Sequence, residues 1–176
     1  GSTESGWFTD PARTAGGAFI DHGVYSLDLI SWLVDSPVEE VTHAEMLRSN
    51  DNLSVEDYGM AAIRLANGAV GIVEETWFSP AFSITLEVRG TEGELTAQVG
   101  REPALYLRTH DEGPTVVEAM DQETYGPALA AFVAALGRGE DTSRRSLRMM
   151  ELCAQAYDLA AASPSSGQAG KPPVLP

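Results

Sequence analysis

The sequence feature that most constrains the fold is the dipeptide Asn67-Gly68, which lies between two apolar runs at residues 58–65 and 70–78. An Asn-Gly pair in this position is the strongest short-range signal for a β-hairpin. The two runs are therefore predicted to pair as antiparallel strands.

Helix and strand periodicities follow one another in a fixed order along the chain. Helical spacing of apolar residues predicts a helix at about 17–34, which ends before Pro37 because a residue preceding proline avoids the helical region. The predicted strands are residues 38–48, 58–65, 70–78, 82–88, 94–99, 104–108 and 115–118, and the predicted C-terminal helices are residues 124–136 and about 142–162. This order predicts an α+β fold, in which an open, mostly antiparallel β-sheet carries helices packed on one face.

A chain of 176 residues can form one domain with appendages. Residues 1–15 are polar and turn-rich and are predicted to be an entering arm. Residues 16–162 are predicted to be the α+β domain. Residues 163–176 are rich in Ser, Gly and Pro and are predicted to be a loose tail.

The strands at 58–65 and 70–78 carry apolar side chains on both faces. One face has Met60, Ala62, Ile72 and Phe78, and the other has Ile63, Leu65, Val73 and Trp77. A sheet with helices on one side only should have one polar face. Either a second copy of the chain covers the open face in a homo-oligomer, or twist of the sheet buries it in part. The sequence leaves both alternatives open.

Composition excludes several classes of function. The net charge of −15 argues against binding to nucleic-acid phosphates. No apolar run of about 18 residues is present, so neither a membrane span nor a signal peptide is predicted. A single cysteine, Cys153, allows no intrachain disulfide and favours a cytoplasmic setting. Its position among apolar helical residues predicts a core residue rather than a nucleophile.

Cofactor and metal motifs are also missing from the sequence. No G-x-G-x-x-G follows a predicted strand, so no dinucleotide site is predicted in this chain. His22, His43 and His110 lack the spacing of metal ligands, and no metal site is predicted.

A narrow polar stripe lies on the predicted helix at residues 17–34. At about 100° per residue, Asp21, Tyr25, Asp28 and Trp32 share one stripe, and the broad opposite face is apolar. Carboxylates and a phenol on such a helix are costly unless they are hydrogen-bonded or face a cavity. The stripe is therefore the predicted place for chemistry.

Around this stripe the chain resembles the C-terminal domain of the Gfo/Idh/MocA oxidoreductases. The family pattern is a glycine pair, a short apolar stretch and D-x-G-x-H-x-x-D. Here the pattern is matched by Gly16-Gly17, Asp21, Gly23, Tyr25 and Asp28, with tyrosine in place of the histidine. Further matches, in the family's order, are Trp7 with Asp10-Pro11, Trp32-Leu33, residues 37–41, Asn67-Gly68-Ala69, Gly90-Thr91-Glu92-Gly93 and Gly139-Glu140-Asp141.

The resemblance covers nearly the whole chain and implies one half of a two-part enzyme. In the family a Rossmann domain binds NAD or NADP, and the C-terminal domain supplies much of the substrate pocket and the oligomer interface. A lysine of an E-K-P motif in the Rossmann half lies beside the substrate. NAD or NADP is therefore expected in the parent protein and not in this fragment.

Two residues carry over from the motif as functional candidates. Asp21 is expected to hydrogen-bond the substrate, and Tyr25 is expected to be catalytic. A free phenol has a pKa of about 10 and is a poor base at neutral pH, so Tyr25 is expected to need the lysine of the Rossmann half.

Other residues are expected to surround this pair. His22 is a candidate for the substrate pocket, and Trp7 and Arg13 could line its mouth. For Trp7 a packed anchor, and for Arg13 a solvated charge, are equal alternatives. The residues expected to be structural near the site are Gly16, Gly17, Gly23 and Asp28.

The resemblance predicts the substrate-binding and oligomerisation domain of an NAD(P)-dependent oxidoreductase. The parent enzyme would transfer hydride between nicotinamide and a sugar, a polyol or a related hydroxyl or carbonyl compound, and the chain alone is expected to be inactive. One alternative is a non-catalytic, ligand-sensing or protein-binding member of the same fold. A third is a free-standing module that oligomerises through its sheet.

Overall fold

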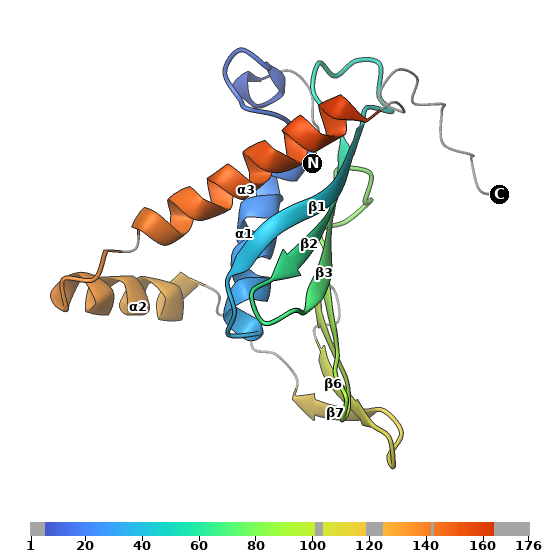
Figure 1. Ribbon diagram of the computed structural model, residues 1–176, viewed down its shortest axis with the longest axis vertical. Helices are drawn as coiled ribbons and strands as arrows, with labels where there is room; N and C mark the ends of the chain where they lie inside the picture. Colours follow the sequence, from blue (N-terminus) through green and yellow to red (C-terminus); the bar gives the residue numbers. More distant parts are fainter. Residues whose placement is uncertain (1–5, 101–103, 119–124, 142, 164–176) are drawn as a thin grey trace. The chain divides into compact units, whose positions relative to one another are not determined.

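A computed structural model describes residues 6–100, 104–118, 125–141 and 143–163 (Figure 1). Its elements are η1 (Trp7–Thr9), α1 (Ala18–Leu33), β1 (Val38–Leu47), β2 (Tyr58–Leu65), β3 (Val70–Thr76), β4 (Ile84–Arg89), β5 (Gly93–Val99), β6 (Ala104–Thr109), β7 (Thr115–Glu118), α2 (Tyr125–Gly137) and α3 (Ser143–Ala162). The α+β class is confirmed. Residues 1–5 of the expected arm, the expected helix residues 124 and 142, and the expected tail from residue 164 lie outside the described residues.

The chain forms two compact units. One comprises the residues up to 78 together with those from 142 onward, and the other comprises residues 79–141. The strands accordingly form two antiparallel sheets, β1-β2-β3 and β4-β5-β6-β7, where a single sheet was expected. The domain limits expected at residues 15 and 162 stay predictions.

The hairpin expected at Asn67-Gly68 is confirmed. β2 and β3 pair antiparallel, with Arg64 opposite Val70. Gly68 has a φ of +86°, a conformation that suits glycine. The backbone N–H of Ala69 donates to Oδ1 of Asn67 at 3.0 Å and holds the turn.

Helices α1 and α3 cover one face of the β1-β2-β3 sheet (Figure 1). The core between them and the sheet comprises Phe19 and Leu27 of α1, Met149, Leu152, Cys153, Ala156 and Ala160 of α3, and Val38, Val41, Ala44, Ala61, Ile63, Leu65 and Val73 of the strands. The α3 residues recur every three or four positions, as one face of a helix requires. Burial raises the pKa of the Cys153 thiol to about 12, which suits a core residue and not a nucleophile.

The opposite face of this sheet is open and carries both apolar and charged side chains, with Glu40, Arg64 and Glu74 on the same face as Val70 and Ile72. Val70 and Ile72 are 75% and 70% exposed. Met60 and Ala62, on the neighbouring strand, are half-buried. Twist of the sheet therefore does not bury the apolar side chains of β3 on this face.

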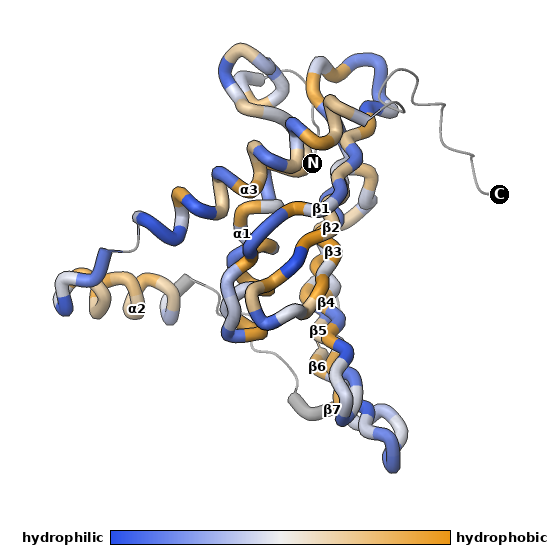
Figure 2. The backbone as a smooth tube through the Cα atoms, in the orientation of Figure 1, coloured by the Kyte–Doolittle hydropathy of each residue, from blue (hydrophilic) through white to orange (hydrophobic). Residues whose placement is uncertain are grey.

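The second unit combines the β4-β5-β6-β7 meander with α2. Figure 2 shows hydrophobic residues along most of α2. Its large apolar side chains Leu129, Phe132, Val133 and Leu136 are exposed. Among the described parts of the chain, no helix combines the length and the apolar character that crossing a membrane requires.

Candidate functional site

The N-terminus of α1 is held by the carboxylate of Glu56, which precedes β2. Both carboxylate oxygens lie 2.8 Å from the backbone nitrogen of Gly17, and Oε1 also accepts the N–H of Phe19 at 3.1 Å. The carbonyl oxygen of Glu56 accepts the N–H of Ala18 at 3.0 Å. The first N–H groups of a helix have no partner within it, and Gly17 offers no side chain to cap them. Glu56 therefore replaces the missing N-cap.

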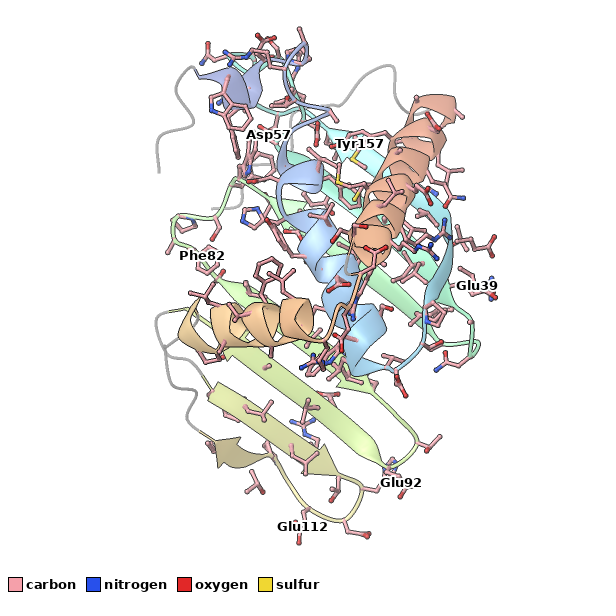
Figure 3. The ribbon with its side chains drawn as sticks, turned by 90° about the vertical axis from the view of Figure 1, so that its left-hand side faces the viewer. Glu39, Asp57, Phe82, Glu92, Glu112 and Tyr157 are labelled. Carbon is pink, nitrogen blue, oxygen red and sulfur yellow. The ribbon has the colours of Figure 1, made fainter. Side chains whose placement is uncertain are left out.

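Tyr157 connects α3 to the same point (Figure 3). Its hydroxyl donates to Oε1 of Glu56 at 2.6 Å and accepts the backbone N–H of Ile20 at 3.2 Å. Burial, with the nearby Glu56 carboxylate, raises the pKa of Tyr157 far above its ordinary value. The phenol is therefore a fixed structural hydroxyl that fastens α3 to α1.

This packing explains the glycine pair at residues 16 and 17. A Cβ at Gly17 would lie 2.0 Å from the carbonyl oxygen of Glu56, and a Cβ at Gly16 would lie 2.0 Å from the hydroxyl oxygen of Tyr157. Neither space can hold a methyl group. At Gly23 a Cβ would meet the Phe19 ring at 3.5 Å, an ordinary contact.

The same contacts decide whether α1 could hold a dinucleotide. The N-terminus of a helix after glycines is a common phosphate site, because its N–H groups are free. Here the N–H groups of Gly17, Ala18 and Phe19 already donate to Glu56. The residues around α1 therefore do not fit the pyrophosphate of NAD or NADP. The described residues also contain no group of three or more side chains that could hold a metal ion.

Asp21, in the first turn of α1, lies at the centre of a polar and aromatic cluster. The indole Nε1–H of Trp77 donates to its Oδ2 at 3.2 Å. Nδ1 of His22 lies 3.0 Å from the same oxygen. Oδ1 accepts no hydrogen bond from any residue that the structure describes, and the side chain is 21% exposed. Asp21 therefore presents one held oxygen and one available acceptor.

Tyr25 lies one helical turn further along α1, beside His22. The two rings are 6.4 Å apart between centroids and inclined by 60°. Tyr25 is 70% exposed, and its hydroxyl has no partner among the described residues. The structure thus brings Asp21, His22 and Tyr25 onto one exposed surface of the helix.

The expected arm contributes aromatic rings to this cluster. Phe8 stacks on Trp77 with centroids 5.9 Å apart, and Trp7 meets Phe8 edge-on at 5.3 Å. Trp7 itself is more than half exposed. The side chain of Arg13 is exposed and makes no hydrogen bond or ion pair within the described part of the chain. The structure therefore joins Trp7 to the cluster through Phe8, and the place of Arg13 at the substrate mouth stays a prediction.

Asp28, three residues after Tyr25 on α1, pairs with Arg145 of α3. Nε of Arg145 donates to the Asp28 carboxylate, and Nη2 donates to the Asp28 carbonyl oxygen at 3.2 Å. Both side chains are nearly half exposed. Asp28 thus fastens the middle of α1 to α3.

Glu75 of β3 is the second carboxyl group near Asp21. Ser26 of α1 donates from its hydroxyl to Oε1 of Glu75 at 2.5 Å. Burial raises the pKa of Glu75, and the charge of Asp21 raises it further, whereas the Ser26 hydrogen bond and His22 lower it. The net result is a carboxyl group with a pKa above its ordinary value, half-buried under α1.

Sequence reasoning missed Glu56, Trp77, Glu75 and Tyr157. Trp77 and Glu75 lie within the predicted strand at residues 70–78, and Tyr157 lies within the predicted helix at about 142–162. The predicted hairpin does not by itself show that residues at the end of β3 lie near the start of α1. That proximity depends on how α1 packs on the sheet. No local pattern in the sequence marks these four residues.

Comparison with known proteins gives a consistent result. A family model described as the GFO/IDH/MocA C-terminal domain matches residues 1–96. No curated protein matches the chain. Among solved structures, an oxidoreductase domain protein from Kribbella flavida has a TM-score of 0.72 at 17% identity. The match covers 90% of this chain and 53% of the Kribbella flavida protein.

Two further solved structures are similar. An aldose-aldose oxidoreductase from Caulobacter crescentus, complexed with glycerol, has a TM-score of 0.73 at 18% identity. The match covers 92% of this chain and 50% of the Caulobacter crescentus enzyme. The WlbA dehydrogenase from Bordetella pertussis, in complex with NADH and UDP-GlcNAcA, has a TM-score of 0.61 at 22% identity. The match covers 85% of this chain and 47% of the dehydrogenase. At these identities the similarity shows the fold. The chain spans about half the length of these proteins.

Replacing Tyr157 by Phe should destabilise the protein. The substitution removes a hydrogen bond to a carboxylate, which typically contributes about 1.5–3 kcal/mol, and leaves the Ile20 N–H without its acceptor. Urea unfolding followed by circular dichroism measures the loss. Tyr25→Phe is the matched control and should change stability by less than about 0.5 kcal/mol, because its hydroxyl is exposed.

The two variants should also differ at alkaline pH. The pKa of Tyr157 is raised on folding, so its contribution is complete below its ordinary value of 10.0 and is lost as the pH rises above it. Tyr157→Phe should lack this part of the alkaline destabilisation. Equal alkaline profiles for wild type and Tyr157→Phe would contradict the buried hydrogen bond.

Replacing Glu75 by Gln should stabilise the protein at neutral pH. The pKa of Glu75 is raised on folding, so its contribution is present below the ordinary value of 4.5 and is lost as the pH rises through the folded value. A neutral amide keeps the acceptor for Ser26 without this loss. Thermal unfolding between acidic and neutral pH should show the advantage of Gln growing as the pH rises. Glu87→Gln, on an exposed side chain of β4, is the control and should show no such trend.

Proposed function

Since the chain belongs to the GFO/IDH/MocA C-terminal domain family, we propose that it is the substrate-binding and oligomerisation domain of an NAD(P)-dependent oxidoreductase. The proposed substrate is a sugar, a polyol or a related hydroxyl or carbonyl compound. The observation that carries the proposal is Asp21, on the helix of the family motif, with one oxygen held by Trp77 and the other available. An available carboxylate oxygen beside exposed aromatic rings suits a ligand with hydroxyl groups.

In this proposal each residue of the cluster has a separate task. Oδ1 of Asp21 accepts a hydrogen bond from a substrate hydroxyl. Tyr25, which is exposed beside it, passes a proton to or from the reacting oxygen. His22 and Trp7 line the substrate site. Since a free phenol is a poor base, Tyr25 acts with a cationic group from outside this chain.

The nicotinamide cofactor, when bound to the parent protein, supplies or takes up the hydride. The contacts of Glu56 with the N-terminus of α1 leave no phosphate site there, so the proposal assigns the dinucleotide to a preceding Rossmann domain. Solved proteins of similar fold carry NADH with UDP-GlcNAcA in one case and glycerol in another. These hydroxyl-rich ligands support the proposed substrate class.

A second candidate function is ligand binding without turnover. It is favoured by Tyr25, which stands at the position of the family's histidine and has no hydrogen-bond partner among the described residues. In this alternative Asp21 still binds a hydroxyl group, and no proton is transferred. Turnover by the parent protein discriminates between the two.

We also propose that the open face of the β1-β2-β3 sheet is the contact between copies of the chain. Val70 and Ile72 form an exposed apolar patch on β3, next to the half-buried Met60 and Ala62 of β2. A contiguous exposed apolar patch commonly marks an interaction site. A second copy of the same face would be self-complementary about a two-fold axis.

The chain alone should show no dehydrogenase turnover with NAD⁺ or NADP⁺ and a panel of sugars and polyols. The parent protein with its Rossmann domain should be active, and Tyr25→Phe in it should lower kcat by about a hundredfold or more, the usual effect of losing an acid–base group. Tyr106→Phe, in the second unit, is the control. Turnover by the chain alone would contradict the assignment of the cofactor, and a parent that binds sugars without turnover would favour the non-catalytic alternative.

A charged residue on the open sheet face should dissociate the proposed oligomer. Multi-angle light scattering is expected to show an oligomer for the wild type and a monomer for Ile72→Lys, because the charge would have to be desolvated in the contact. Leu147→Lys replaces another exposed apolar residue, on α3, and should leave the oligomer intact. A monomeric wild type would remove the proposed interface.

A further inference from the structure

The backbone at Trp77 is fixed by a buried acidic residue. The N–H of Trp77 donates to the carbonyl oxygen of Asp57 at 2.9 Å. Asp57 is 2% exposed, and its carboxylate accepts the N–H and hydroxyl of Ser49 and the N–H of Asn50 at 2.8–3.0 Å. A carboxylate with three donors is held firmly in place. The main chain at Trp77 is therefore attached to a rigid point directly after β3.

The side chain of Trp77 is fixed on both sides. Its ring is covered by Phe8 at a centroid distance of 5.9 Å with the planes inclined by 29°. Its Nε1–H donates to Oδ2 of Asp21 at 3.2 Å. Trp77 is only partly exposed, so this bond is shielded from water more than a surface contact would be.

We infer that Trp77 is a positioning residue for substrate recognition, acting through Asp21. Together with Nδ1 of His22, which lies 3.0 Å from the same oxygen, the indole holds Oδ2, restricts rotation of the Asp21 carboxylate and leaves Oδ1 for an incoming hydroxyl group. The inference rests on the proposed function, because it concerns the same site. A carboxylate oriented before binding loses less freedom when the ligand arrives, which raises affinity without adding a contact to the ligand.

The contact with Phe8 extends this role to the arm before α1. Phe8 belongs to η1 and stacks on Trp77, and among the described residues the indole connects that ring to Asp21. The arm therefore influences the affinity of the site through the indole. Phe8 is a second positioning residue, one step further from the ligand.

The first test needs no ligand. The chain has three tryptophans, and their indole N–H groups give separate signals in a ¹H–¹⁵N spectrum. Trp77→Phe identifies the signal of Trp77. Asp21→Asn is expected to move that signal strongly and to leave those of Trp7 and Trp32 in place. If the Trp77 signal keeps its position in Asp21→Asn, the inference is overturned.

The second test is a double-mutant cycle on ligand binding. Glycerol, D-glucose and myo-inositol are titrated into the chain, and the affinity of the tightest of the three is compared between variants. Trp77→Phe keeps the ring that stacks on Phe8 and is expected to weaken binding about tenfold, as loss of a hydrogen bond to a carboxylate does. In the Asp21→Asn background the same change is expected to have no further effect, because the indole acts through Asp21.

Two further variants guard against loss of folding. Phe8→Leu leaves Trp77 and Asp21 intact and is expected to weaken ligand binding about threefold. In the Asp21→Asn background, Phe8→Leu is expected to cause no further loss of affinity. Tyr106→Phe changes an aromatic residue of β6, in the second unit, and is the control with unchanged affinity.

The outcomes separate the inference from the proposed function. If the losses from Trp77→Phe and Asp21→Asn add, Trp77 acts independently of Asp21 and the inference is wrong, while the substrate site stands. If the wild-type chain binds none of the three compounds, the proposed substrate site fails and the role of Trp77 fails with it.

Discussion

The carboxylate of Glu56 at the N-terminus of α1 is the contact on which the first unit depends. It joins three segments at one point, since it receives N–H groups from Gly17 and Phe19 and the hydroxyl of Tyr157 on α3. Hydrogen bonds to a carboxylate are stronger than those between neutral groups, and the positive end of the helix dipole favours an acidic group here. The orientation of α1, and with it the placement of Asp21 and Tyr25, follows from this contact.

With Glu56 at its N-terminus, α1 uses different parts for folding and for the proposed ligand site. Its N-terminus is used for folding, and its exposed surface, one turn further on, is left for a ligand. The cluster around Asp21 is built from different supports, namely the indole of Trp77 and the ring of Phe8. The site can therefore vary in its aromatic residues without disturbing the attachment of α1 to α3.

Much of the fold could be predicted from the sequence because the signals are local. Asn67-Gly68 gave the hairpin, and the period of apolar residues gave α1 and α3 and the core position of Cys153. The polar stripe on α1 indicated Asp21 and Tyr25, though not their partners. Trp77 reaches Asp21 across 56 residues, and Tyr157 reaches Ile20 across 137. Such pairs depend on how helices pack on the sheet, which a single sequence does not specify. The division into two sheets depends in the same way on pairing between distant strands.

The close approach at Gly16 couples two distant positions in the evolution of this fold. A Cβ there would occupy the place of the Tyr157 hydroxyl. A homologue that acquires a side chain at position 16 must therefore lose or shift the tyrosine, and a homologue without the tyrosine is released from the need for glycine. The two positions should change together, so that this half of the glycine pair records the identity of residue 157 rather than any chemistry at the substrate.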